Sequence, residues 1–379
     1  MRMQSLLLIF AVALFPAVVQ AHKPSDSYLT LRVEGANVEG QWDIALRDLD
    51  FAVGLDTDAD GRIRWGELES RAEAVDAYAQ SRLAIAAAGT LCPTRVESHQ
   101  VDRHSDGAYA VLRFRAACPS TPASLLLDYG LLFDLDPQHR GLLRIEGTGG
   151  AGAATAIFSA DARRQEIEIG APAGLRTFAT YTREGIWHIW IGYDHVLFLL
   201  SLLLPAVLFR EAGRWHPATR LRPALADLLG VVSAFTVAHS ITLSLAALGL
   251  VSIPSRLVES AIAASVVLAA LNNLWPVVEG RRWAVAFGFG LIHGLGFASV
   301  LADLGLPRAT LVTALLAFNV GVESGQLAIV LAVAPVAWLL RESALYRRVV
   351  FAAGSAAIAL LAGIWLLERG FDVRFFGAS

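Results

Sequence analysis

The pattern of hydrophobic and polar positions changes once along this chain, near residue 180. Before that point, short stretches alternate apolar with polar residues or are rich in β-branched residues, at 27–33, 40–46, 108–115 and 166–169. A period of two is typical of half-buried strands. The first part of the chain, residues 22–180, is therefore predicted to form a small α+β or β-sandwich-like domain.

From residue 186 onward the chain is a series of long apolar segments. Six of them follow one another, at about 186–208, 227–250, 256–278, 284–304, 309–339 and 348–368. Each has about 20 residues or more, the length that an α-helix needs to cross the core of a bilayer. A composition of 55% hydrophobic and 17% charged residues agrees with this. We expect an α-helical membrane protein with six transmembrane helices over 186–368, and the lipid bilayer as a partner.

Two signals predict the topology. Arg2, an apolar run and Ala21 form a typical signal peptide over residues 1–21, which makes 22–180 an exported domain. Arginines gather in the loops after the first, third and fifth apolar segments: Arg210, Arg214, Arg220, Arg222, Arg281, Arg282, Arg341, Arg347 and Arg348. The positive-inside rule places these loops in the cytoplasm. The N-terminal domain and the C-terminus are then periplasmic, at a bacterial inner membrane.

The exported part holds the only two cysteines, Cys92 and Cys118. Oxidising compartments preserve disulfides, so these two are predicted to form one. Cleavage after residue 21 would leave His22 as the N-terminus, where its amine and imidazole could chelate a metal together. A third ligand would then be needed, such as His104 or His139. The net charge of −3 argues against a nucleic-acid partner.

Ionisable residues inside the predicted membrane helices are the first candidates for a functional site, because they are costly there. The first helix carries His188, Asp194 and His195. The two histidines are seven positions apart, so on a straight helix they share a face about 10 Å apart. That spacing predicts successive stations, with His188 at the outer mouth, unless the helix bends near Gly192.

Other predicted helices offer polar groups at a similar depth. These groups are His239, His293, Asn319, Glu323 and Gln326, the last three on one helix at i, i+4 and i+7. Imidazole with carboxylate and amide oxygen suits a borderline divalent ion such as nickel, cobalt, zinc or iron. Copper(I) favours Met and Cys, and the two methionines of the chain both lie in the signal peptide. Interhelical hydrogen bonding without any metal is the alternative interpretation of these residues.

Four motifs together resemble the HupE/UreJ family. They are His188-x3-Gly192-x-Asp194-His195, Phe235-Thr-x2-His239-Ser-x-Thr242, His293-Gly294, and Phe318-Asn319-x-Gly321-Val-Glu323-x-Gly325-Gln326. The resemblance covers about 186–368 and implies a nickel or cobalt permease, with a partner in metalloenzyme maturation. The chain departs from the compact family pattern in its large exported domain and in Ile189, where a proline often follows the first histidine.

The exported domain contains a second candidate metal site, over residues 56–67. Its sequence matches the calcium-binding pattern D-x-D-x-D-G-x5-E. The predicted ligands are Asp56, Asp58, Asp60, the carbonyl of Arg62, and Glu67. The alternative interpretation is an acidic turn that caps the following helix.

These observations predict a permease for a divalent transition metal, nickel or cobalt being the substrate, with calcium bound in the exported domain. The alternative is a calcium-binding sensor or accessory protein for metalloenzyme assembly, without transport. We do not expect an enzyme, because neither G-x-S-G nor H-E-x-x-H occurs in the sequence. An intramembrane metal-dependent oxidase or hydrolase is the enzymatic alternative that remains.

Overall fold

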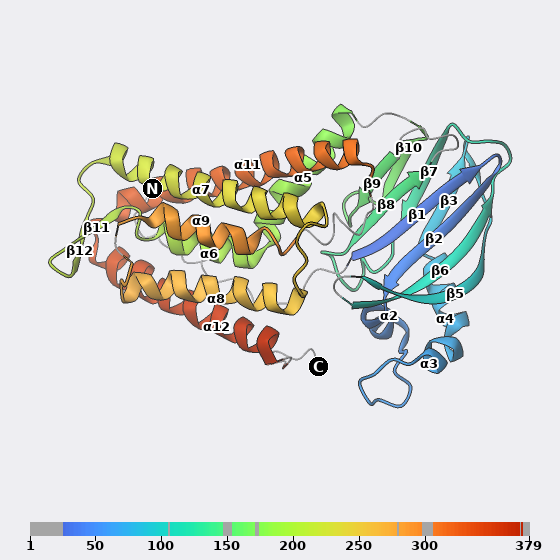
Figure 1. Ribbon diagram of the computed structural model, residues 1–379, viewed down its shortest axis with the longest axis horizontal. Helices are drawn as coiled ribbons and strands as arrows, with labels where there is room; N and C mark the ends of the chain where they lie inside the picture. The colour runs from blue at the N-terminus through green and yellow to red at the C-terminus, as the bar shows by residue number, and fades with distance from the viewer. Residues whose placement is uncertain are drawn as a thin grey trace. The chain divides into compact units, whose positions relative to one another are not determined.

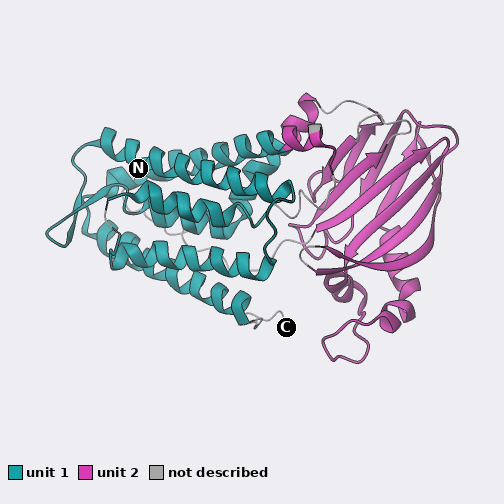
Figure 2. Ribbon diagram, viewed as in Figure 1, with its two compact units in different colours: residues 1–22, 181–298, 315–379 teal, residues 23–180, 299–314 magenta. Residues whose placement is uncertain are grey.

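The computed structural model describes residues 26–104, 107–146, 154–170, 174–278, 280–297, 306–371 and 373. The predicted signal peptide, His22 and the end of the fourth predicted helix lie outside these residues. The described residues divide into two compact units, which Figure 2 shows in different colours. The β-rich unit comprises residues 26–180 with 306–314, and the helical unit comprises the others.

The β-rich unit is built on two sheets. One sheet has the strand order β5-β6-β2-β1-β8-β9 and the other has the order β10-β7-β3-β4. Neighbouring strands are antiparallel except for β1 and β8, which are parallel. The elements are β1 (Asp26–Glu34), β2 (Asn37–Ala45), α2 (Leu46–Val53), α3 (Trp65–Ser70), α4 (Ala72–Gln80), β3 (Leu83–Ala87), β4 (Thr90–Leu91), β5 (Thr94–His104), β6 (Gly107–Ala117), β7 (Ser124–Tyr129), β8 (Arg140–Glu146), β9 (Ala154–Phe158) and β10 (Arg164–Glu168).

Alternation along the strands produces one core between the two sheets. On β1, Leu29 and Leu31 are buried while Arg32 is exposed, as a period of two requires. Leu125 and Leu127 of β7, in the other sheet, belong to the same hydrophobic cluster. The apolar faces of both sheets therefore pack on one another, and the prediction of a β-rich N-terminal domain is confirmed.

The disulfide between Cys92 and Cys118 is present, as predicted. It joins the turn before β5 to the end of β6, and both cysteines belong to the core. It therefore adds a covalent link at one end of the β5–β6 hairpin.

The helical unit consists of helices that run alongside one another, with a short hairpin at one end (Figure 1). Its elements are α5 (Leu175–Ile191, which begins in the β-rich unit), α6 (Tyr193–Leu203), β11 (Leu208–Glu211), β12 (Arg214–Pro217), α7 (Leu221–Ala247), α8 (Ser255–Leu274), α9 (Arg282–His293), α11 (Arg308–Leu340, whose first turns belong to the β-rich unit), the π-helix η2 (Tyr346–Ala353) and α12 (Gly354–Phe371).

Among the described residues, four helices, or five spans if one bent pair is counted, are long and apolar enough to cross a membrane, so the predicted six spans are not confirmed. Four are Leu221–Ala247, Ser255–Leu274, Thr310–Leu340 and Tyr346–Phe371, and the fifth is the bent pair α5 and α6. The described part of the predicted helix at 284–304 contains α9, which ends at His293 and has 12 residues, and residues 298–304 lie outside the described part. Glycines at 294 and 296 follow it, and glycine disfavours helix continuation.

Glycines bring the helices of this unit into close contact. A Cβ on Gly185 of α5 would overlap the carbonyl of Phe318 on α11, and a Cβ on Gly321 would overlap the carbonyl of Thr182. In the same way, Gly290 of α9 lies directly against the backbone of α7. Small residues are what membrane helices use to approach one another closely, and here they bring α5 against α11 and α9 against α7.

Candidate metal site

A break at Gly192 determines how the first two histidines lie. The helices α5 and α6 meet there at an angle of 69°. The rings of His188 and His195 consequently approach to 4.6 Å between centroids. The prediction of two stations about 10 Å apart, with His188 at an outer mouth, is wrong, and the bend near Gly192 that the sequence left open is what the structure has. Glycine is required at this position because a Cβ would crowd the carbonyl of His188 and the ring of His195.

Two more histidines approach the pair from other helices. The ring of His239 on α7 lies 6.0 Å from that of His195 and 6.2 Å from that of His188. The ring of His293, the last residue of α9, lies 5.1 Å from that of His195. Two imidazoles on one tetrahedral ion have centroids roughly 5 Å apart, given metal–nitrogen bonds of about 2.1 Å. The distances from His195 to His188 and to His293 match this spacing, and the distances from His239 to His195 and His188 are longer.

Several imidazole nitrogens of this cluster are buried and have no hydrogen-bond partner among the described residues. They are Nε2 of His188, Nε2 of His195, both ring nitrogens of His239, and Nδ1 of His293. Buried polar atoms are nearly always paired, so five unpaired atoms in one place require an explanation. Histidine binds a metal through the lone pair of a ring nitrogen.

The remaining nitrogens of His195 and His293 are held by neighbours. Asp194 Oδ1 lies 2.9 Å from Nδ1 of His195 and accepts a second hydrogen bond from the backbone amide of the same residue. Ser265 of α8 lies 2.8 Å, through its Oγ, from Nε2 of His293. A carboxylate that accepts from one ring nitrogen leaves the other free to coordinate, which is the usual arrangement around a metal-binding histidine.

Sequence reasoning missed Arg369, in the last turn of α12. Its Nη1 lies 3.9 Å from Oδ2 of Asp194, and both side chains are largely buried. Arg256 at the start of α8 donates to the carbonyls of Arg369 and Gly370 and so ties down the end of α12. An arginine at the end of the last apolar segment was visible in the sequence, but its partner on α6 was not.

Aromatic rings enclose the histidines. Phe297 and Phe318 stack on one another and both contact the ring of His188. Phe235 faces the ring of His293 at 5.3 Å between centroids. Beside His195 a cavity of about 10 Å³ remains, which Gln326 also lines. That is about the space for one water-sized particle, in surroundings that exclude bulk water.

The predicted residues of α11 divide into two groups. Asn319 accepts a hydrogen bond from Ser240 at 2.7 Å, and Gln326 accepts one from Thr236 at 2.8 Å, both on α7. Glu323 is exposed on the outside of the helical unit, so its predicted place beside the histidines is wrong. Glu323 and Gln326 are three positions apart, so their side chains point in directions roughly 60° apart around the helix axis. That angle is enough to take Glu323 off the buried face.

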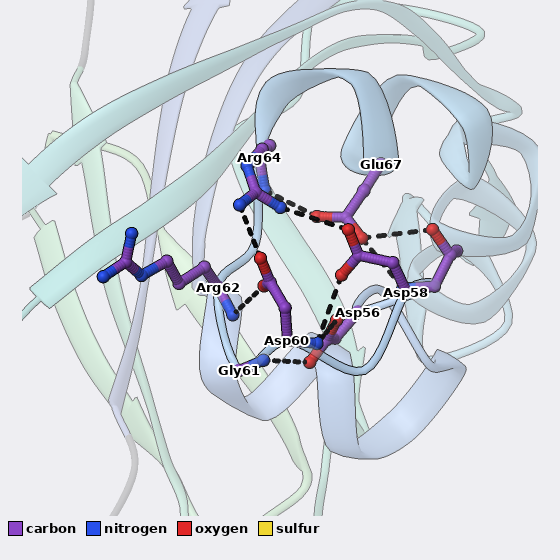
Figure 3. A network of polar contacts seen from close by, with 8 residues as sticks. Asp56, Asp58, Asp60, Gly61, Arg62, Arg64 and Glu67 are labelled. Atoms are coloured by element: carbon purple, nitrogen blue, oxygen red, sulfur yellow. Dashed lines mark hydrogen bonds and ion pairs between the residues drawn. The ribbon is translucent and has the colours of Figure 1, made fainter.

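The acidic loop of the β-rich unit forms a separate site between α2 and α3 (Figure 3). Asp56, Asp58 and Asp60 bring one carboxylate oxygen each within 4.8 Å of one another. Gly61 makes the sharp turn with a positive φ of 78°. The three predicted aspartate ligands are therefore close enough to share one cation.

The other two predicted ligands lie differently. Glu67 accepts hydrogen bonds from the amides of Thr57 and Arg64, at 2.9 and 2.8 Å, and is not one of the grouped carboxylates. Arg62 donates its amide to Asp60. The guanidinium of Arg64 pairs with both Asp58 and Asp60 and lowers the pKa of Asp60. The cation of Arg64 is thus paired with two of the three aspartates that the sequence assigns to calcium.

The histidines proposed as third ligands for His22 already have partners. Nε2 of His104 lies 2.9 Å from Asp43, and Nε2 of His139 lies close to Ser27 and Tyr129. His22 itself lies outside the described residues, so the N-terminal metal site stays a prediction.

Comparison with known proteins identifies the helical unit. The family model described as HupE / UreJ protein matches residues 163–369, more than half of the 379 residues. The chain belongs to the HupE/UreJ family. No curated protein matches the chain. The HupE/UreJ match covers all four histidines, Asp194 and Arg369, and together with the apolar helices it indicates a membrane protein.

Proposed function

We propose that this HupE/UreJ family member is a membrane permease for a divalent transition metal ion, nickel or cobalt. The observation that carries the proposal is the group of five unpaired imidazole nitrogens on three separated segments of the helical unit. Borderline divalent ions favour such ligands. The helical unit contains neither Met nor Cys, which disfavours copper(I).

The looseness of the cluster supports transport rather than permanent binding. Among the described residues, only the aspartates of the acidic loop bring three ligand atoms within 4.8 Å of one another. The imidazoles would have to rotate about their side-chain bonds to close on an ion, and could open again to release it. A permanent structural site would have four ligands already at bonding distance.

The test is uptake of labelled nickel and cobalt by cells that produce the protein, together with ion binding by the purified protein. His195→Ala and His293→Ala are expected to abolish uptake and to weaken binding at least tenfold. His216→Ala is the matched control, because His216 lies on β12 and contacts Phe209 instead. Uptake that survives both cluster substitutions would refute the proposal.

An accessory or sensor role is the second candidate, favoured by the separate β-rich unit with its own acidic loop. It predicts that the purified protein binds metal while cells that produce it accumulate no more than cells without it. The same pair of measurements therefore separates the two functions.

The arginine-rich loops further support a topology in which the β-rich unit and the C-terminus are periplasmic, at the inner membrane. Alkaline phosphatase fused after the C-terminus should then be active, and a fusion after Arg214 should be inactive. The reverse result would invert the topology.

We propose in addition that the acidic loop binds calcium in the weak range of extracellular modules. Arg64 competes with the ion for Asp58 and Asp60, so Arg64→Ala should tighten calcium binding and Asp58→Ala should abolish it. Calorimetry on the full chain measures both. Identical calcium affinity in wild type and Arg64→Ala would contradict the competition.

A further inference from the structure

A second polar cavity lies at the end of the helical unit that carries the β11–β12 hairpin. Its volume is about 330 Å³, and it is lined by β12, the end of α8 and the π-helix η2. On α8 it begins at Asn273, eight residues beyond Ser265, which contacts the histidine cluster. Eight residues of helix span about 12 Å, so this cavity is distinct from the metal site.

The π-helix brings two consecutive arginines to this cavity. Arg347 and Arg348 both line it, together with Trp215 and Phe351, whose rings meet edge-on at 5.1 Å. π-helical turns are rare and often mark functional positions. The result is a pair of guanidinium groups beside an aromatic wall.

These two guanidinium groups lack partners, unlike other arginines at the same end of the unit. In the described part of the chain neither makes a hydrogen bond or ion pair, and Nε of Arg347 is buried. By contrast, Arg341 donates to the carbonyls of Ala218 and Trp338, and Arg282 pairs with Asp227 at 3.0 Å. The described lining contains no carboxylate. Two unpaired cations in a cavity attract an anion, and arginine forks fit phosphate oxygens.

The surface next to the cavity is apolar. Leu345 and Val349 adjoin the two arginines in sequence, and Trp275 and Val277 follow the α8 residues of the lining; all four are exposed, Trp275 by 68% and Val277 by 88%. A ligand with an anionic phosphate and hydrocarbon chains satisfies both features at once. We propose that this cavity binds the phosphate of an anionic phospholipid, with the acyl chains along these exposed residues.

The experiment uses the full-length protein, purified in detergent and stripped of lipid. Thermal unfolding is followed on addition of phosphatidylglycerol, phosphatidylcholine or inorganic phosphate. Phosphatidylglycerol should raise the melting temperature of the wild type, and phosphatidylcholine should not. The double variant R347A/R348A should lose this shift, with an apparent affinity at least tenfold weaker.

The matched control is R220A/R222A, which removes the same charge at the start of α7 from two arginines that do not line the cavity. It should keep the full shift. Equal losses in both double variants would overturn the proposal, because general charge attraction would then suffice. An equal rise in melting temperature with inorganic phosphate would overturn the proposal of a lipid ligand, because the cavity would then bind a free anion. If R347A/R348A does not fold, the single variant R348A, at an exposed position, provides the same comparison.

Discussion

Replacing Asp194 with asparagine tests the arrangement of the metal site most directly. The carboxylate holds His195 through two hydrogen bonds, at 2.8 and 2.9 Å, and faces Arg369 at 3.9 Å. An asparagine side chain at this position would keep the shape and could still accept from Nδ1, but the negative charge would be lost. The imidazole of His195 would lose the anion that faces its Nδ1, and the cation of Arg369 would be left without its partner.

The size of the effect follows from these contacts. Removing the carboxylate behind a metal-binding histidine weakens metal binding by about 10- to 100-fold, which corresponds to about 1.4–2.7 kcal/mol. The uncompensated charge of Arg369 repels an incoming divalent ion and acts in the same direction. We therefore expect the upper part of this range for Asp194→Asn.

The assay is titration calorimetry with nickel and with cobalt on the purified full-length protein, at fixed pH and ionic strength. Glu323→Gln is the matched control, since it removes the other carboxylate that the sequence placed in the site. Glu323 is exposed, so its replacement should leave the dissociation constant unchanged. Circular dichroism and thermal unfolding confirm that both variants are folded.

Two results would refute the reasoning. A folded Asp194→Asn protein whose dissociation constant changes less than threefold would show that the carboxylate does not support a metal ligand. An equal loss in Glu323→Gln would show that α11 turns its carboxylate toward the histidines when the ion binds.

Three further predictions concern stability. Gly321→Ala should lower the free energy of unfolding by about 1–3 kcal/mol, because its Cβ would overlap a backbone carbonyl of α5. Gly363 lies in open space, so the control Gly363→Ala should be neutral or stabilising by up to about 1 kcal/mol. Equal melting temperatures of the two variants would contradict this. Replacing Cys92 and Cys118 with serine should lower the free energy of unfolding of the β-rich unit by about 3.5 kcal/mol, given a sequence separation of 26. Amide hydrogen exchange in β5 and β6 should become faster, and unchanged exchange would disprove the prediction. Hydrogen bonds from backbone amides lower the pKa of Glu67 below its ordinary 4.5. The ionised carboxylate should therefore stabilise the loop fully above pH 4.5, and this stabilisation should be lost as the pH falls below 4.5. A midpoint above 4.5 in an NMR titration would show that folding instead favours the protonated carboxyl group.

The sequence was sufficient for features that depend on local patterns. The expected strands at 27–33, 40–46, 108–115 and 166–169 correspond to β1, β2, β6 and β10, because alternation records directly which face is buried. Most apolar segments became helices long enough to span a bilayer, because length and hydrophobicity alone decide that property. The disulfide followed from the only two cysteines of the sequence, which both lie in its first part.

Tertiary structure decided how the polar groups meet. A straight helix would keep His188 far from His195, and only the bend at Gly192 joins them. The same structure removes Glu323 from the site and adds Arg369. Membrane helices are apolar on nearly every side, so their sequence indicates depth but not which neighbour each face will contact. Close packing of glycines between particular helices provides that information, and it exists only once the helices are assembled.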